Sequence, residues 1–273
     1  GVSTQCGYGK KKRRWGKNKK QYTAKEKNTM KKLLTLILAL AMALSLVACG
    51  SSDKKDDSGE KTYTVGVVQL VQHEALDAAT KGFTDALKEA LGDKVNVVVK
   101  NASGDSNTCG TIVNGFLADN VDLIMANATP ALQAAASATS TVPILGTSVT
   151  DYATALEIAN WTGTVGGNIS GTSDLAPLDQ QVAMLQELFP NAKKVGMLFC
   201  SSEPNSKYQV DEVTKLLSNA GITCTEFAFT DSNDVSSVTQ KACDASDVLF
   251  IPTDNTAASN TEAIANVVLA SNT

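Results

Sequence analysis

The chain has 273 residues, of which 24 are Lys or Arg and 28 are Asp or Glu, and these charges are unevenly distributed. Half of the basic residues precede Cys49, so residues 49–273 keep 12 basic and 27 acidic side chains and a formal charge of −15. Because nucleic-acid affinity comes largely from cationic contacts with phosphates, this acidic body argues against nucleic acid as a partner. Its 225 residues are enough for one large domain or two of ordinary size.

A basic start, a short apolar core and small residues before a cysteine form a secretory signal at residues 30–48. Its uncharged stretch is shorter than the roughly 20 apolar residues of a membrane span, and Cys49 lies where a bacterial lipoprotein carries its lipid. We therefore expect an extracytoplasmic protein, anchored to the cell membrane through lipidated Cys49. The alternative is an uncleaved amphipathic or buried helix. Residues 1–29 are interpreted as a non-native upstream extension, because a secretory signal acts at an N-terminus.

Residues 49–61 are polar and charged and are expected to form a flexible tether. Beyond them, strands are expected at 63–70, 95–99, 121–126 and 142–145, and helices at 74–91 and 107–119. Another short helix opens at Thr129, which is placed to cap it, with Pro130 at its first position. This alternation predicts parallel βαβ units, so residues 62–151 form a first α/β lobe with four strands.

The pattern changes after Asp151. Residues 159–174 are rich in Gly, Asn, Ser and Thr, and we assign residues 152–177 to an inter-lobe crossing and loop. Helices are then expected at 178–189, 205–220, 234–243 and 256–270, with strands at 194–199, 222–229 and 248–252. Residues 178–273 therefore form a second α/β lobe, and two similar lobes in tandem are the plan of a bilobal binding protein. With three strands against four, this lobe is expected to be truncated at its C-terminus.

Ligands of open α/β sheets bind at the carboxyl ends of the strands, and there the sequence places six short loops rich in Ser, Thr, Asn and Asp. Helix capping and turn formation favour the same residue types, so each loop by itself has a purely structural alternative. Six such loops facing one cleft favour a binding site. The candidate ligand-binding residues are Gln72, His73, Thr129, Thr150, Asp151, Ser173, Asp174, Glu203, Asn205, Ser206, Thr253, Asp254 and Asn255.

A series of short, distinct segments occurs in order along residues 62–273. It comprises Val65-Gly66-Val67-Val68-Gln69 with His73-Glu74-Ala75-Leu76-Asp77, Asn101-Ala102-Ser103-Gly104-Asp105, Ala128-Thr129-Pro130, Val149-Thr150-Asp151, Gly166-Gly167-Asn168 with Gly171 and Ser173-Asp174, Pro190-Asn191-Ala192-Lys193, Glu203-Pro204-Asn205-Ser206 and Pro252-Thr253-Asp254-Asn255-Thr256. Together these segments resemble the ABC-transporter substrate-binding protein family that includes tryptophan- and tyrosine-type binders. Two positions depart from the family pattern, because Glu74 and Tyr152 stand where the family usually has Pro.

The resemblance implies a two-lobed periplasmic-binding-protein-like (type I) α/β fold, in which each lobe is a parallel sheet flanked by helices and crossing segments form the hinge. It also implies a small-molecule ligand closed between the lobes, an aromatic or other small amino acid, which is delivered to an ATPase-driven ABC permease in the membrane. The family continues well beyond residue 273, which agrees with the expected truncation of the second lobe.

An amino-acid ligand needs an anion near its ammonium group and hydroxyl or N–H donors at its carboxylate. Asp254 and Asp151 are expected to face the ammonium, since attraction to a cation offsets the desolvation cost of a buried carboxylate. Helix N-termini would add partial positive charge at the carboxylate. The expected donors to the carboxylate are Thr129, Ser173, Asn205 and Ser206.

Catalysis, cofactors and metal binding are not expected. His73 is the only histidine, and no nucleophile elbow, phosphate loop or dinucleotide-binding motif occurs. The cysteines at 109, 200, 224 and 243 lack metal-ligand spacing and are interpreted as buried thiols, with disulfides as the alternative outside the cytoplasm. Three functions remain: the receptor of an ABC importer, a ligand-sensing module for a sensor kinase or chemoreceptor, and an extracytoplasmic enzyme on the same scaffold.

Overall fold

A computed structural model of the chain describes residues 61–271, which belong to one compact unit. The upstream extension, the secretory signal, Cys49 and the tether up to residue 60 lie outside the described residues. Within residues 61–271, no helix combines the length and the apolar character that crossing a bilayer requires.

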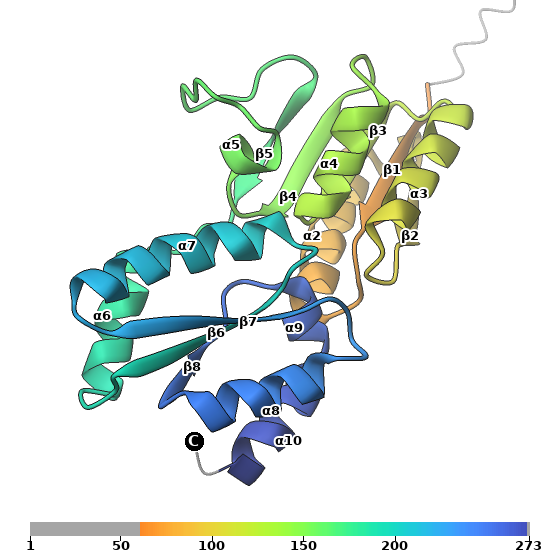
Figure 1. Ribbon diagram of the computed structural model, residues 1–273. Coiled ribbons are helices and arrows are strands. Elements are labelled where there is room, and N and C mark those ends of the chain that lie inside the picture. The colour runs from red at the N-terminus through yellow and green to blue at the C-terminus, as the bar shows by residue number, and fades with distance from the viewer. Residues whose placement is uncertain (1–60, 272–273) are drawn as a thin grey trace, which may run out of the picture. The chain divides into compact units, whose positions relative to one another are not determined.

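The first sheet has five parallel strands in the order β2-β1-β3-β4-β5 (Figure 1). They are β1 (Tyr63–Gln69), β2 (Val95–Asn101), β3 (Leu123–Asn127), β4 (Ile144–Val149) and β5 (Ile169–Ser173). β1 lies between β2 and β3, and its residues from Val65 onward are buried, as expected for a parallel strand covered on both faces. We call residues 63–173 lobe 1.

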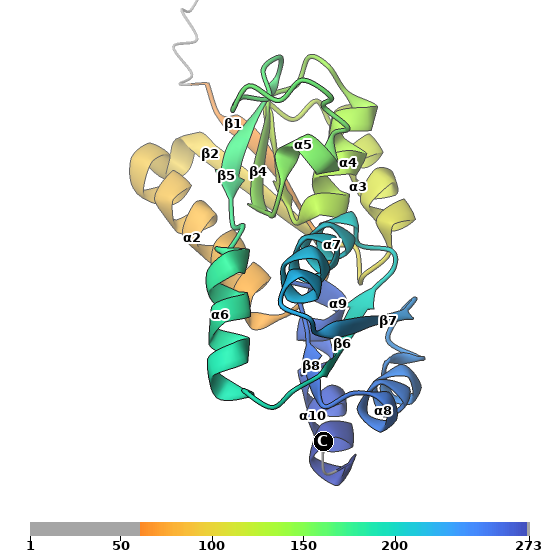
Figure 2. The same cartoon turned by 60° about the vertical axis from the view of Figure 1, so that its left-hand side comes forward.

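Helices cover both faces of this sheet (Figure 2). α2 (Glu74–Leu91) lies on one face, and α3 (Ser106–Ala118) and α4 (Thr129–Ala138) lie on the other. The short helices η1 (Gly92–Lys94) and α5 (Tyr152–Ala155) complete the lobe. Val68, Phe116 and Leu132 belong to its core, and the Phe116 ring lies so close to Gly66 that a β-carbon would not fit there.

The second sheet has three parallel strands in the order β7-β6-β8: β6 (Lys194–Cys200), β7 (Thr223–Phe229) and β8 (Val248–Phe250). α6 (Leu178–Leu188) and α7 (Pro204–Asn219) pack together on one face, while α8 (Val235–Ala245) and α10 (Thr261–Ser271) pack together on the other (Figure 1). The short helix α9 (Asn255–Ser259) precedes α10. We call residues 178–271 lobe 2.

The expected alternation and the three strands of the second sheet are confirmed, but the first sheet has five strands rather than four. β5 lies in a stretch that the sequence interpreted as loop, because small residues replace the usual large apolar ones. The structure gives the reason. The Tyr152 ring packs against Gly146 and Gly171, where no β-carbon would fit, and its hydroxyl donates to the carbonyl of Thr172 over 3.2 Å.

The structure also shows where three of the helices begin or end. The single helix expected at residues 256–270 is divided at Asn260 into α9 and α10. Glu74 and Tyr152, which replace the usual Pro of the family, are the first residues of α2 and α5. Pro is favoured at that position but not required, so both helices still begin where the family pattern places them.

Candidate functional site

Polar residues at the carboxyl end of the second sheet form one hydrogen-bonded cluster. The six candidates that the sequence assigned to lobe 2 all belong to it, and five of them are buried while Thr253 is exposed. They come from the start of α7 and from the loop between β8 and α9. Parallel strands end at the same edge of a sheet, which is why segments about 50 residues apart in sequence meet here.

Glu203 accepts more hydrogen bonds than any other residue of this cluster. It is 2% exposed, and its carboxylate accepts hydrogen bonds from the backbone N–H and Nδ2 of Asn255 at 3.0 and 2.6 Å. The backbone N–H and hydroxyl of Thr256 donate to it at 2.8 Å each, and Nδ2 of Asn205 donates at 3.2 Å. These neutral donors satisfy the buried charge, since no ion pair within residues 61–271 involves Glu203.

Asp254 is the second buried carboxylate of the cluster. It caps α9 by accepting the N–H of Ala257 at 2.7 Å, and it accepts the N–H of Cys200 at 2.7 Å, which ties the end of β6 to the start of α9. Burial, and next the nearby negative charge of Glu203, raise the pKa of Asp254 to about 6. Two acidic groups thus share a buried region without a cation, and such a region favours a positively charged ligand group.

Gln209 and Thr256 complete the cluster, although the sequence analysis did not single them out. Gln209 is fully buried, and its amide donates to the carbonyls of Asn205 and Thr253 and accepts the N–H of Thr253, each at 3.1 Å. Gln209 follows Asn205 by four residues and therefore lies on the same face of α7, a spacing that could have identified it. It holds in place the loop that carries Asp254.

In lobe 1, the start of α4 combines a strained backbone with a buried hydroxyl. Ala128 has φ 96° and ψ 157°, a region that residues other than Gly rarely adopt. The sequence predicted that Thr129 caps α4, and this was wrong: the carbonyl of Ala128 accepts the first helical hydrogen bond, from Leu132 at 3.0 Å. Thr129 is therefore the first helical residue, 2% exposed, and its hydroxyl has no hydrogen-bond partner in the described chain.

Four further candidates, Thr150, Asp151, Ser173 and Asp174, lie at the carboxyl ends of β4 and β5. The hydroxyl of Ser173 donates to the carbonyl of Thr150 at 2.7 Å, which ties the ends of these two strands together. Asp151 caps α5 by accepting the N–H of Thr154 at 2.7 Å. Burial raises the pKa of Asp174, against the opposing effect of a hydrogen bond with Thr150. The structure thus brings these four candidates together at one edge of lobe 1.

Three of the four residues expected to bind a ligand carboxylate already use their donors inside the protein. The donors of Ser173 and Asn205 are engaged as described, and the hydroxyl of Ser206 hydrogen-bonds to Asp254. Of the four, Thr129 keeps a hydroxyl without a partner. Conversely, Oδ1 of Asn205, an acceptor beside the two carboxylates, is buried and also lacks a partner among the described residues.

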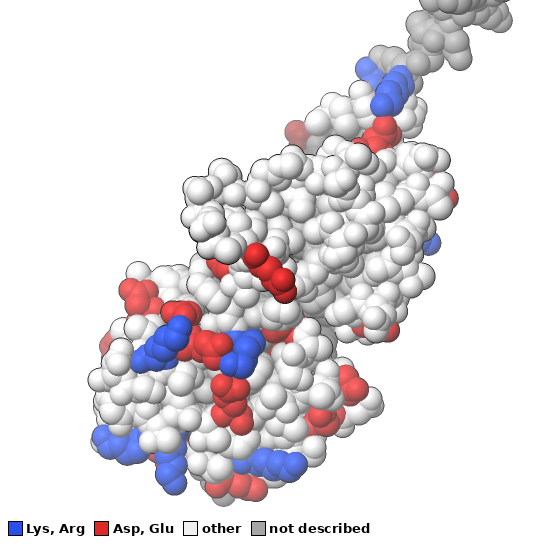
Figure 3. Space-filling view, turned by 45° about the horizontal axis from the view of Figure 1, so that its top comes forward, with Lys and Arg blue, Asp and Glu red and all other residues white. Residues whose placement is uncertain are grey.

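Charged side chains of both signs gather over lobe 2 in Figure 3, whereas the rest of that face carries few charges. On α7, Lys207 pairs with Asp211 and Glu226, and Lys215 pairs with Glu212, so these lysines are engaged at the surface. The sequence has no Arg after Arg14. Within residues 61–271 a ligand carboxylate therefore meets no guanidinium, and the hydroxyl of Thr129 and the N–H groups at the start of α4 are candidate donors.

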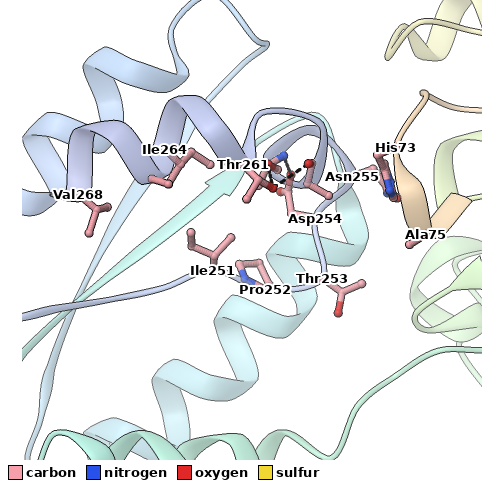
Figure 4. A pocket seen from close by; sticks show the side chains of 13 residues that line it. His73, Ala75, Ile251, Pro252, Thr253, Asp254, Asn255, Thr261, Ile264 and Val268 are labelled. Atoms are coloured by element: carbon pink, nitrogen blue, oxygen red, sulfur yellow. Dashed lines mark hydrogen bonds between the residues drawn. The ribbon is translucent and has the colours of Figure 1, made fainter.

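A pocket of about 400 Å³ opens beside the carboxylate cluster (Figure 4). Its polar side is formed by His73, Thr253, Asp254 and Asn255, and its apolar side includes Ile251, Ile264 and Val268. His73 reaches the pocket from the start of α2 in lobe 1, so both lobes contribute to it. Gln72, by contrast, is exposed and lies along a separate hollow between α2 and β2, away from His73.

Residues 61–271 contain no group of three or more His, Cys, Asp or Glu side chains placed to hold a metal ion.

Cys109, Cys200 and Cys224 are free thiols. Burial raises the pKa of Cys109 to about 11, and it raises the pKa values of Cys200 and Cys224 above the usual range of a thiol. The interpretation as buried thiols is confirmed for Cys109, Cys200 and Cys243, whereas Cys224 is only half-buried.

Two α/β lobes that both contribute residues to one pocket define a bilobal binding protein. Residues 64–272 match the family described as ABC transporter substrate binding protein, and the chain belongs to this family. It is therefore an extracytoplasmic substrate-binding protein of an ABC transporter rather than an enzyme.

Relatives with known names and structures agree with this assignment. The chain is 36% identical over 249 residues to the Tyrosine-binding protein of Clostridioides difficile strain R20291, covering 87% of this chain and 72% of the relative. A solved ABC domain from Streptococcus pneumoniae in complex with L-Trp is 35% identical, with a TM-score of 0.73 over 77% of this chain and 72% of that one. The predicted two-lobed type I α/β fold is thereby confirmed.

A third relative has a similar sequence but a lower TM-score. A substrate-binding protein with adhesive properties from Clostridium difficile, solved as a ligand-free, open structure, is 36% identical over 77% of this chain and 72% of that one. Its TM-score is 0.52, although its sequence is as similar as that of the L-Trp complex. The described chain thus superposes better on the complex than on the open structure.

Proposed function

We propose that the chain binds the zwitterion of an amino acid between its lobes and delivers it to an ABC permease. The names of two relatives, one a Tyrosine-binding protein and one solved with L-Trp, support an amino acid with an aromatic side chain. The observation that carries the ligand class is the pair of buried carboxylates, Glu203 and Asp254, which lie together without a cation.

The ammonium group is assigned to lobe 2. Glu203 already accepts hydrogen bonds from several neutral donors, whereas Asp254 has a raised pKa and lines the pocket. An ammonium group near Asp254 would offset its desolvation and could donate to the unpartnered Oδ1 of Asn205. Asp151 was also expected to face the ammonium. We keep it in the proposal as an acidic residue at the edge of lobe 1.

The carboxylate group is assigned to lobe 1. α4 is ten residues long, and the N–H groups of its first turn carry partial positive charge. The hydroxyl of Thr129 lies at that turn without a partner, and the strained Ala128 sets the direction in which the turn begins. Backbone strain of this kind is retained where the surrounding structure requires it, often at ligand sites. Thr150, Ser173 and Asp174 would border this position.

The side chain of the ligand is assigned to the pocket. A volume of about 400 Å³ falls within the range typical of small-molecule sites, and the wall formed by Ile251, Ile264 and Val268 is apolar. An apolar wall beside a polar mouth suits an amino acid with an aromatic or aliphatic side chain. Thr253, His73 and Asn255 form the mouth.

A thermal-shift screen of the proteinogenic amino acids tests this proposal. Trp or Tyr should raise the melting temperature, whereas tryptamine, which lacks the carboxylate, and indole-3-propionate, which lacks the ammonium, should bind at least about tenfold more weakly than Trp. Equal binding of tryptamine and Trp would rule out the carboxylate position. Equal binding of indole-3-propionate and Trp would rule out the ammonium position, and no response to any amino acid would reject the ligand class.

We further propose that Cys49 carries a lipid that anchors the protein to the outside of the cell membrane, as the signal at residues 30–48 supports. Replacing Cys49 with Ser should abolish incorporation of labelled fatty acid and release the protein from the membrane fraction. Cys109→Ser removes a buried thiol of lobe 1 and serves as the control, because it should leave the labelling unchanged. Unchanged labelling of the Cys49→Ser protein would contradict the anchor.

A further inference from the structure

His73 and Asn255 form a hydrogen bond between the two lobes. Nε2 of His73, at the start of α2, lies 3.3 Å from Oδ1 of Asn255, at the start of α9 (Figure 4). Among the hydrogen bonds between side chains of residues 61–271, it is the one that joins lobe 1 to lobe 2. The two residues are 182 positions apart in the sequence.

The surrounding hydrogen bonds decide which atom donates. Nδ2 of Asn255 donates to the carboxylate of Glu203 at 2.6 Å, and the amide oxygen of Asn255 can only accept. Oδ1 of Asn255 therefore faces His73, and the imidazole must donate from Nε2. The buried carboxylate cluster thus fixes the acceptor, and His73 supplies a donor to it from the opposite lobe.

The position of His73 is unusual for a purely structural residue. It is the N-cap of α2, where Ser, Thr, Asp or Asn would accept an N–H of the first turn, yet its side chain makes no capping hydrogen bond. Its ring points toward lobe 2 instead (Figure 4). At the N-cap, His73 departs from the usual preference for a capping side chain and contacts the other lobe. Such departures from local preference are expected at functional positions.

We infer that the hydrogen bond between His73 and Asn255 is a latch that stabilises the closed arrangement of the lobes. The latch gives these two residues a positioning role, in addition to their place at the mouth of the pocket. The higher TM-score with the L-Trp complex than with the open relative is consistent with a closed arrangement in the described chain. Because Asn255 also donates to Glu203, the latch connects the buried carboxylate cluster of lobe 2 to lobe 1.

A latch of this kind raises ligand affinity by favouring the closed arrangement, separately from any contact that the mouth of the pocket makes with the ligand. If the ligand binds the closed arrangement, apparent affinity scales with the fraction of molecules already closed. Loss of one hydrogen bond should lower the equilibrium constant for closing about fivefold, which corresponds to about 1 kcal/mol. Where the closed form is the minor one without ligand, the Kd should rise by the same factor.

The test measures the distance between the lobes in single molecules of the ligand-free protein. Fluorophores are attached through azide-bearing residues placed at Asn114 on α3 and Lys241 on α8, both exposed, so that the native cysteines are not used. His73→Leu removes the donor and keeps an apolar side chain of similar bulk. His73→Gln serves as the matched variant, because its Nε2 can donate from nearly the same position.

The latch predicts that His73→Leu shifts the population toward the open form about fivefold, and that His73→Gln restores most of the closed population. An unchanged distance distribution in His73→Leu would overturn it, as would a failure of His73→Gln to restore closure in a protein that melts normally. The Kd measurement rests on the proposed function, but the distance measurement needs no ligand. An absence of amino-acid binding would therefore reject the proposed function and leave the latch to be judged by distance alone.

Discussion

In lobe 2, the polar groups at the strand ends are almost all hydrogen-bonded to one another, whereas in lobe 1 the hydroxyl of Thr129 is buried without a partner. Lobe 2 presents two buried carboxylates, and lobe 1 presents the start of α4 with its partial positive charge. The two lobes share the same α/β plan, yet the lobe 2 edge holds two hydrogen-bonded carboxylates beside the unpartnered acceptor Oδ1 of Asn205, while the lobe 1 edge offers an unpaired donor.

This difference matches the two ends of an amino acid. A zwitterion has a cationic group that suits the carboxylates of lobe 2 and an anionic group that suits the donors of lobe 1. Residues 61–271 contain no Arg, so the described part of neither lobe offers a guanidinium to the carboxylate. The following predictions test whether the two edges have separate roles.

The largest effect is expected at the negative edge. Asp254→Asn keeps the shape of the side chain but removes the charge, so it should weaken amino-acid binding at least about 100-fold, the cost of breaking a buried charge pair. Titration calorimetry at pH 7.5 measures this loss. Asp247→Asn is the matched control, because Asp247 also accepts two backbone N–H groups, at 2.7 and 2.9 Å, but is far from the strand ends that bind ligand. If the affinity of Asp254→Asn falls less than tenfold, Asp254 does not bind the ammonium group.

The pKa of Asp254 predicts opposite effects of pH on binding and on stability. The ionised form binds the ammonium, so affinity should fall as pH drops below about 6, approaching tenfold per pH unit. In the ligand-free protein the folded-state pKa of about 6 exceeds the unfolded value of about 3.9. The contribution of Asp254 to stability is therefore fully present below about pH 4 and is lost as pH rises to about 6.

The difference in unfolding free energy between wild type and Asp254→Asn, measured from pH 4 to pH 7, isolates this contribution. Asp247, whose pKa is lowered by the N–H groups of Lys193 and Lys194, changes stability in the opposite direction, but equally in both proteins. A difference that does not change with pH would mean that the pKa of Asp254 is not raised in the folded protein.

A smaller effect is expected at the donor edge. Thr129→Val removes the unpartnered hydroxyl while keeping the shape, so affinity should fall about tenfold, while the unfolding free energy should stay the same or rise. Thr239→Val is the control, because it removes a buried hydroxyl that donates to Val235 at 2.7 Å. It should lower stability by about 1 kcal/mol and leave the Kd unchanged. If both variants behave alike, the hydroxyl of Thr129 has no role in binding.

The smallest effect concerns the strained backbone beside Thr129. Ala128→Gly relieves the unfavourable φ of 96° and should raise the unfolding free energy by about 1 kcal/mol, with the Kd changed less than about twofold. Urea unfolding measures the gain. Ala126→Gly in β3 is the control and should destabilise the protein, because Ala126 has no such strain and Gly weakens a strand. Destabilisation by both substitutions would contradict the strain at Ala128.

The sequence alone determined the alternation of strands and helices, the division into two lobes and the edge at which the polar loops lie. These features follow from local patterns, such as the buried run at 65–70 and the amphipathic spacing of α2, which depend on residues close together in the chain. β5 escaped this reasoning because its small residues carry no strand pattern, and its pairing with β4 depends on the packing of Tyr152.

Only the tertiary structure decided which polar groups are free and which are already paired. Ser173 and Asn205 have the composition of ligand donors, yet neighbours distant in sequence occupy them, while Thr129 is left without a partner. The raised pKa of Asp254 and the contact between His73 and Asn255 likewise depend on groups about 50 and 182 positions away. A sequence pattern reports the type of each side chain, but hydrogen bonding and desolvation are set by the atoms that folding places around it.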